Sequence, residues 1–377
     1  MTTHKDRLKF AVSAVDSAGL GAFTVSTAAS GMQTLGSGND GQIFDLFIQE
    51  GAAWEFRSGM TYTHSGTSLS RGGLVASSTG SAIAFTSAAV VFEDASAYLL
   101  ALLELAMSGV RPGGRLTLTT AVPVTTSDVT GATSIYYTPY LSNVIPLWDG
   151  ARWKPIEFSE YTLALGTLTS GRPYDVFAYI SSGVLALEVL AWTNDTTRAT
   201  AVTIQDGRYC KSGDKTRLYL GTFYTTATTT TEDSKVKRYL WNAYNQAPKQ
   251  MEFNSNDAGH TWTGGSGFRA YNNSSANKVE FVCGLTAELQ MFAAAVLARS
   301  AGTASFVQIS WALDTTSSAD SSVLPETSTS TSVFRALGGG ITQATAGYHA
   351  VQLLERLVNS ADTLSASFGQ LLGDIAC

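Results

Sequence analysis

Apolar and polar residues alternate along several short stretches of this 377-residue chain, a pattern typical of strands with one buried face. The alternation is clearest in residues 42–48, 54–56 and 306–313. Residues 184–192 are almost continuously apolar, which predicts a central strand that is buried over most of its length. Residues 348–355 are apolar enough to resemble a helix, but turn-forming residues flank them on both sides, so we expect a strand there too.

Turn-forming pairs separate these apolar runs. Aspartate or serine followed by glycine tolerates the positive φ angles that a tight hairpin turn requires. Such pairs predict hairpins at three places: Asp149-Gly150, Ser182-Gly183 and Asp206-Gly207. The threonine-rich segment 225–233 is expected to form a polar hairpin loop or an exposed arm.

Short strands and frequent turns favour an all-β fold with three mainly antiparallel β domains in series, at residues 1–110, 111–248 and 249–377. The third domain is expected to be a jelly-roll-like sandwich. An apolar helix is predicted over residues 94–107 of the first domain, with leucines on nearly all of its sides. Such a helix must be enclosed, either within its own domain or by two further copies about a threefold axis. Residues 108–114 are expected to form a linker.

Composition narrows the classes of partner. Charged residues make up only 14% of the chain, against about a quarter in ordinary globular proteins. Low charge indicates that apolar surface is buried between subunits. The net charge of −6 argues against nucleic acid and against anionic membranes as partners. The basic run 235–238 is expected to be a solvated face or an inter-domain pairing patch.

Cysteine spacing and the N-terminal sequence give further expectations. Cys210, Cys283 and Cys377 lie far apart and form no metal-binding motif, so we expect no zinc site and no cofactor. The polar, charged start predicts no secretion signal. The longest apolar run, residues 98–107, is too short to cross a bilayer. The protein is therefore expected to be made in a cytoplasm without secretion.

The sequence contains no recognisable catalytic constellation. No nucleophile motif lies near any of the four histidines: His4, His64, His260 and His349. His349 is expected to be a satisfied strand residue. The closest carboxylate pairs, Glu157 with Glu160 and Glu232 with Asp233, lie in polar contexts and are expected to be solvated. We therefore predict a protein with no catalytic residues.

A carbohydrate-binding site remains a candidate in the third domain. Aromatic rings stack on sugar faces, and neighbouring amides hydrogen-bond sugar hydroxyls. The residues that fit this pattern are Trp262, Tyr271, Asn272 and Asn273. The alternative is that Trp262 belongs to the core and that Asn272-Asn273 is a plain turn.

Several segments within residues 118–248 resemble, in the same order, a β module of tailed-bacteriophage virion proteins. They are PVTTSDVTGAT (123–133), IYYTPY (135–140), LWDG (147–150), YDVFAY (174–179), LAWTNDTTRAT (190–200) and YLWNAYN (239–245). WEFRSGMTYTHSGTSLSRGGLVASS (54–78) is similar to the N-terminal domain of phage fibre and structural proteins.

This resemblance implies a non-enzymatic structural component of a phage virion, found as a tail fibre, a head fibre or a minor structural protein. A homotrimeric fibre or spike-like appendage on the tail, neck or head is the form that it favours. The partners would be copies of the chain and other virion proteins, and the location would be the virion. The alternative is a receptor-binding protein that recognises host surface glycan through its C-terminal domain.

Overall fold

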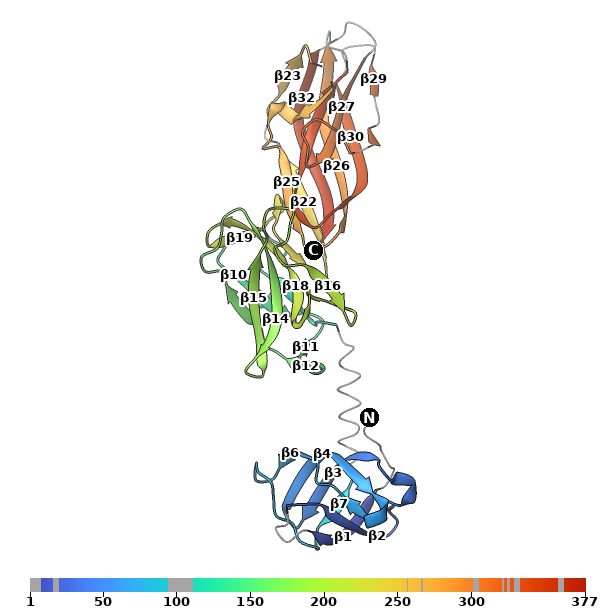
Figure 1. The fold of residues 1–377 in the computed structure, drawn as a ribbon. Helices are drawn as coiled ribbons and strands as arrows, with labels where there is room; N and C mark the ends of the chain where they lie inside the picture. Colours follow the sequence, from blue (N-terminus) through green and yellow to red (C-terminus); the bar gives the residue numbers. More distant parts are fainter. Residues whose placement is uncertain are drawn as a thin grey trace. The chain divides into compact units, whose positions relative to one another are not determined.

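In the computed structural model the described residues form β-strands, loops and short 3-10 turns but no α-helix, which confirms the all-β prediction (Figure 1). Contacts divide the chain into two compact units, Met1–Ala106 and Met107–Cys377. The helix predicted over residues 94–107 lies outside the described residues, and the three-domain division stays a prediction. The structure describes residues 8–15, 20–93, 111–255, 257–265, 267–300, 305–320, 322–323, 326–328, 333–358 and 363–377.

The first unit is an antiparallel sheet that closes on itself, because β3 pairs with both β4 and β7. The sheet order is β3-β7-β1-β2-β5-β4-β6. Its strands are β1 (Lys9–Val15), β2 (Phe23–Ala28), β3 (Ile43–Glu50), β4 (Ala53–Thr63), β5 (Ser68–Leu69), β6 (Gly73–Ser77) and β7 (Val90–Phe92).

The predicted alternation is confirmed in β3, where Phe44, Leu46 and Ile48 are buried. In β4 the charged position of the alternating stretch faces the core, and the aromatic positions do not. Glu55 is fully buried, whereas Trp54 and Phe56 are half-buried on the other face. Phe56 stacks on Phe47 with 4.7 Å between ring centroids.

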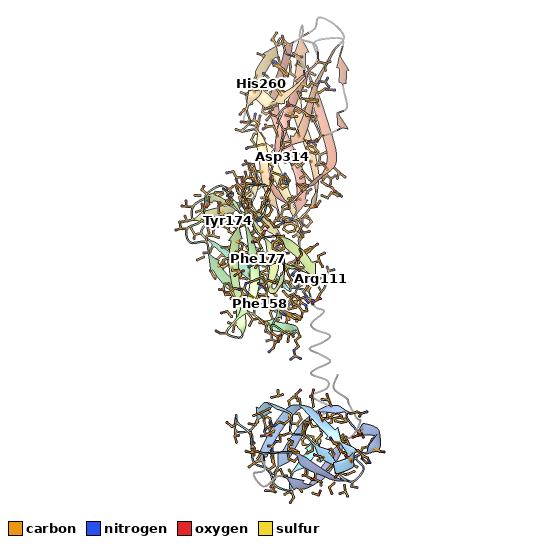
Figure 2. All side chains as sticks on the ribbon, in the orientation of Figure 1. Arg111, Phe158, Tyr174, Phe177, His260 and Asp314 are labelled. Carbon is orange, nitrogen blue, oxygen red and sulfur yellow. The ribbon has the colours of Figure 1, made fainter. Side chains whose placement is uncertain are left out.

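The first half of the second unit surrounds one hydrophobic core, to which Phe158 and Tyr174 contribute (Figure 2). All three predicted hairpins are confirmed, at the β11–β12, β14–β15 and β16–β17 turns. The strands are β8 (Gly114–Thr117), β9 (Val129–Ala132), β10 (Ser134–Pro139), β11 (Val144–Trp148), β12 (Trp153–Glu157), β13 (Tyr161–Ala164), β14 (Pro173–Ser181), β15 (Val184–Ala191), β16 (Val202–Gln205), β17 (Arg208–Lys211), β18 (Asp214–Ala227), β19 (Thr230–Asp233), β20 (Lys237–Arg238) and β21 (Leu240–Asn242).

One strand differs from its predicted place. The apolar run 184–192 forms β15, which lies at the end of its sheet and pairs with β14 alone. Val184 is 62% exposed at the hairpin, whereas Leu185, Ala186 and Leu187 are buried. The prediction of a central strand was wrong, because side-chain packing on its faces, not strand pairing on both sides, buries this run.

The second half of this unit is a two-sheet sandwich, which agrees with the sandwich expected for the C-terminal region. One sheet has the order β22-β32-β26-β30-β28, and the other contains β25-β31-β27-β29. Residues 306–313 and 348–355 lie in strands, as predicted. The strands are β22 (Pro248–Asn254), β23 (His260–Thr263), β24 (Gly267–Ala270), β25 (Lys278–Cys283), β26 (Ala287–Ser300), β27 (Ser305–Leu313), β28 (Ser322–Val323), β29 (Glu326–Ser328), β30 (Val333–Ala344), β31 (Gly347–Leu357) and β32 (Thr363–Ala376).

A buried ionic junction joins the two halves of the second unit. Asp233 accepts from Arg238 at 3.0 Å and lies 3.3 Å from Lys249 Nζ. Arg238 also donates to the carbonyl of Gln250 at 2.6 Å, and β20 pairs in parallel with β25. The expectation that Asp233 is solvated was therefore wrong. Its carboxylate is buried because two cations from neighbouring elements compensate its charge.

Candidate functional site

The predicted carbohydrate residues lie close together in the sandwich but do not form an open site. Tyr271, Asn272 and Asn273 form a single 3-10 turn after β24. Tyr271 is fully buried, so its ring has no face open to a sugar. Asn272 and Asn273 are exposed, both with a φ of 52°. Asparagine tolerates this left-handed conformation, so the pair serves as a turn.

Trp262 in β23 is also engaged within the protein. The guanidinium of Arg269 lies over its ring at 4.0 Å from the centroid. The backbone at Gly265 approaches the ring so closely that a Cβ there would lie 2.2 Å from a ring carbon. The predicted ring and amide cluster therefore offers exposed amides but no free aromatic face.

Beside Trp262 lies a buried charged cluster centred on His260 (Figure 2). Its Nε2 is 2.7 Å from Glu355 Oε2, and its Nδ1 contacts Asp257. Arg269 Nε donates to the other oxygen of Glu355 at 2.7 Å. Burial lowers the pKa of His260, but the hydrogen bonds to Glu355 and Asp257 outweigh it, so the pKa is raised.

The His260 cluster lacks the geometry of a hydrolase. Both ring nitrogens face carboxylates, and no hydroxyl or thiol of the described residues hydrogen-bonds to the ring. His349 is also satisfied on both nitrogens, by Asp314 at 2.7 Å and by the carbonyl of Thr345 at 2.8 Å. Neither histidine can act as the base of a nucleophile in this arrangement.

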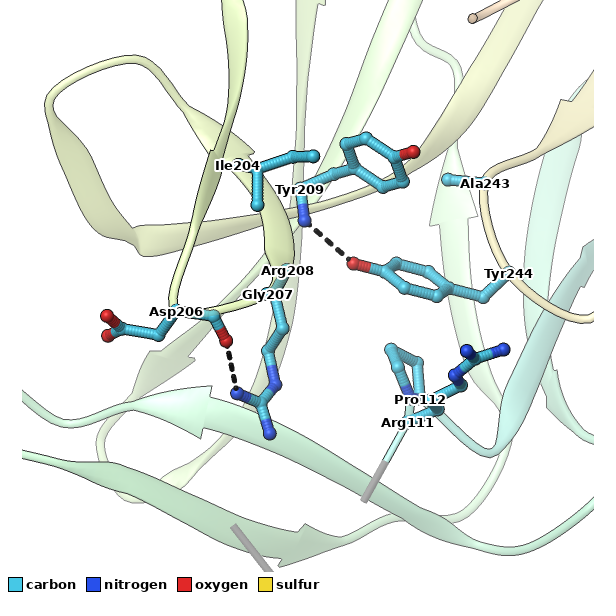
Figure 3. A pocket seen from close by; sticks show the side chains of 9 residues that line it. All are labelled: Arg111, Pro112, Ile204, Asp206, Gly207, Arg208, Tyr209, Ala243 and Tyr244. Carbon is cyan, nitrogen blue, oxygen red and sulfur yellow. Dashed lines mark hydrogen bonds between the residues drawn. The ribbon is translucent and has the colours of Figure 1, made fainter. Parts of the chain in front are cut away.

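A pocket of about 520 Å³ that no prediction had included lies in the second unit (Figure 3). We call it the arginine–tyrosine pocket. It is built by the β16–β17 hairpin, by the segment leading into β8 and by the segment after β21. Its lining residues are Arg111, Pro112, Ile204, Asp206, Gly207, Arg208, Tyr209, Ala243 and Tyr244.

The hairpin turn positions Arg208 in this pocket. Asp206 and Gly207 take φ angles of 51° and 76°, as a tight two-residue turn requires. The guanidinium of Arg208 lies over the Trp153 ring at 4.5 Å from the centroid, and its Nη1 donates to the backbone carbonyl of Asp206 at 3.2 Å. Burial lowers the pKa of Arg208.

The tyrosines form the opposite wall. Tyr244 Oη accepts from the backbone N–H of Tyr209 at 3.0 Å, and the two ring centroids are 6.1 Å apart (Figure 3). Burial raises the pKa of Tyr244, so its hydroxyl keeps its proton at neutral pH. Sequence reasoning identified the Asp206-Gly207 turn but missed the pocket, because Arg111 and Tyr244 are distant from it in sequence.

The described residues include no group of three or more side chains that could hold a metal ion. The described cysteines, Cys210, Cys283 and Cys377, are all buried as free thiols. No described helix is long and apolar enough to cross a membrane.

Comparisons with known proteins add little to this geometry. No protein-family model and no curated protein matches the chain. Among solved structures, it is similar to the mosquito-larvicidal Cry4Aa toxin of Bacillus thuringiensis, with 9% identity, a TM-score of 0.21 and coverage of 70% of this chain and 53% of the toxin. A Bacillus thuringiensis Cry1Da tryptic core variant gives 9% identity, a TM-score of 0.17 and coverage of 71% and 53%. The chain thus spans about half the length of each toxin structure, and similarity at this level establishes no shared function.

Proposed function

We propose that the chain is a non-enzymatic structural protein of a tailed-phage particle, forming a fibre- or spike-like appendage on the tail, neck or head. The observation that carries the proposal is the junction inside the second unit. Buried ion pairs and a shared sheet tie two hydrophobic cores into one compact body. An appendage has to transmit force along its length, and a joint of this kind resists bending better than a flexible linker.

The sequence segments that resemble phage modules support the same proposal, since they fall in β4 to β6 of the first unit and in β9 to β21 of the second. The described residues around His260 and His349 supply no nucleophile, which fits a structural role. Homotrimers and contacts with other virion proteins belong to this proposal as its partners.

Electron microscopy of intact phage particles labelled with a gold-conjugated antibody against the second unit tests the proposal. Label at a fixed position on the tail, neck or head is the expected result. Protein found only in extracts of infected cells, with no label on any particle, would contradict the structural proposal.

A second candidate function is receptor binding. The residues first predicted for it, Trp262 and Tyr271, are covered or buried. The arginine–tyrosine pocket supports it better, because this cavity lies within the size range of small-ligand sites. Binding of labelled protein to host cells, measured for the wild type and for variants of the pocket, tests this candidate.

A further inference from the structure

We propose that the arginine–tyrosine pocket binds a carboxylate-bearing sugar, with Arg111 and Arg208 holding the carboxylate and the tyrosine wall holding the sugar ring. This inference deepens the receptor-binding candidate and rests on it for its biological setting. The binding itself is a property of the pocket and can be measured on the isolated chain.

Arg111 and Arg208 form no ion pair with a carboxylate of the described residues. Arg111 is exposed, and no described acceptor faces its guanidinium. Arg208 donates Nη1 to a backbone carbonyl and has no described carboxylate or other acceptor at Nη2. Guanidinium groups match carboxylates in geometry and bind them by charge-assisted hydrogen bonds. Two guanidinium groups that no described carboxylate hydrogen-bonds therefore favour an anionic ligand in this cavity.

The nearest carboxylate is engaged elsewhere. Asp206 Oδ2 accepts from Lys215 Nζ at 2.7 Å and from the indole nitrogen of Trp153 at 3.1 Å. Figure 3 shows its carboxylate pointing away from the guanidinium of Arg208. Because Lys215 already compensates Asp206, the charge of Arg208 remains available to a ligand.

The rest of the lining fits a sugar ring. The Tyr244 oxygen accepts from the backbone of Tyr209, so its own O–H is free to donate to a ligand oxygen. The rings of Tyr209 and Tyr244, with Pro112 and Ile204, give apolar surface for the C–H face of a pyranose. Polar donors beside aromatic surface suit a molecule that carries both hydroxyls and an apolar face.

Other anions fit less well. A nucleic acid needs a continuous basic track along its backbone. The chain has a net charge of −6, and Asp206 is one of the residues that line the pocket. A single carboxylate on a small, largely neutral molecule meets the two arginines without repulsion from that wider negative charge.

Calorimetric titration of the full chain tests the proposal. The probes are methyl glucuronide, its neutral counterpart methyl glucoside, and acetate as the isolated carboxylate. We expect the glucuronide to bind at least about tenfold tighter than either of the other two, since a charge-assisted hydrogen bond and ring contact contribute together.

Variants assign the binding to the pocket. Arg111→Ala and Arg208→Gln should each weaken glucuronide binding about tenfold, while Arg335→Gln, which removes an exposed cation on β30, should leave it unchanged. Arg111 is exposed, and no hydrogen bond or ion pair joins its side chain to the described residues, so its variant remains informative even if Arg208→Gln unfolds. Circular dichroism confirms that each variant is folded.

Several outcomes would overturn the proposal. Equal binding of glucuronide and glucoside would remove the role of the carboxylate, and acetate binding as tight as glucuronide would reduce the site to a plain anion site. No binding up to about 10 mM, or unchanged binding by both variants, would overturn it as well. A glucuronate trisaccharide that binds tighter than the monosaccharide would identify a polysaccharide as the source, and equal binding would identify a free acid. These results are independent of the gold-labelling experiment, so the structural proposal and this one can fail separately.

Discussion

At the scale of single residues, Glu55 shows how a charged residue can occupy a core position. Its carboxylate is fully buried in the first unit and lies 2.7 Å from Arg57 Nε and 2.9 Å from Arg71 Nη2. Arg71 in turn lies over the rings of Phe23 and Phe85. The charge is tolerated because Arg57 on the same strand and Arg71 in the loop between β5 and β6 both compensate it.

Replacing Glu55 by alanine should therefore destabilise the first unit by about 3–5 kcal/mol, because two buried guanidinium groups lose their counter-charge. Urea unfolding followed by tryptophan fluorescence measures the change. Glu50→Gln removes a carboxylate at the end of β3 that only accepts hydrogen bonds from Thr86 near the surface, so it should cost much less than Glu55→Ala. Equal effects of the two substitutions would contradict the core role of Glu55.

His260 makes stability of the second unit depend on pH. Its pKa is raised in the folded protein by Glu355 and Asp257 against the opposing effect of burial, so the protonated form stabilises the fold. This contribution is fully present below the unfolded pKa of about 6.5 and is lost as pH rises through the folded pKa. The slope should reach about 1.4 kcal/mol per pH unit.

Urea unfolding between pH 5.5 and pH 9 checks this dependence, and His260→Gln should flatten it. Burial lowers the pKa of His349, but hydrogen bonds to Asp314 and to the carbonyl of Thr345 outweigh it and raise the pKa, so His349 leaves a second slope in that variant. His349→Gln is the matched control and should remove that remaining part only. The same slope in wild type and in His260→Gln would refute the assignment.

At the scale of elements, the sequence predicts what local chemistry determines. The three Asp-Gly and Ser-Gly hairpins follow from turn residues alone and are confirmed. The sequence could not predict which side chains of β4 are buried or that β15 lies at the edge of its sheet, because both depend on partners distant in sequence. The predicted sugar site shows the same limit at Tyr271, which has the character of a contact residue, because only tertiary packing shows that it is buried.

The β16–β17 turn gives a test at this scale. Gly207 has a φ of 76°, and valine there should cost about 1–3 kcal/mol of unfolding free energy. The same change should weaken sugar binding, because it displaces Arg208. Gly38→Ala, at an open position without positive φ, is the control and should change neither quantity appreciably. Loss of stability with unchanged binding would show that the turn does not position Arg208.

At the scale of the whole second unit, the buried junction should make two hydrophobic cores unfold together. Asp233→Ala leaves Arg238 and Lys249 buried without their carboxylate and should cost about 3–5 kcal/mol. We expect its calorimetric transition to split into two, since the cores would then unfold separately. Glu232→Ala alters a more peripheral pair with Lys237, 3.5 Å apart, and should keep a single transition. A single transition in both variants would mean that the shared sheet and the apolar contacts between the two halves couple the cores without the ion pair.

We expect copies of the chain to associate through the outer face of the sheet β22-β32-β26-β30-β28. Leu337 and Ile341 on β30 are 58% and 62% exposed, and Phe292 on β26 lies opposite Leu372 on β32. An exposed apolar face of this kind is costly on a monomer. We expect further copies of the chain to cover this face. Asp374 on β32 and Arg335 on β30 carry opposite charges on either side of β26, which favours contact between copies.

Light scattering after size-exclusion chromatography should therefore show a trimer for the wild-type chain. Leu337→Lys with Ile341→Lys should convert it to a monomer, because two charges in the contact cannot be desolvated without partners. Val184→Lys, which changes an equally exposed residue at the β14–β15 hairpin, should leave the trimer intact. A wild-type monomer at micromolar concentration, or a trimer that survives the double substitution, would rule out this face as the subunit contact. The fibre would then have to assemble through other surfaces.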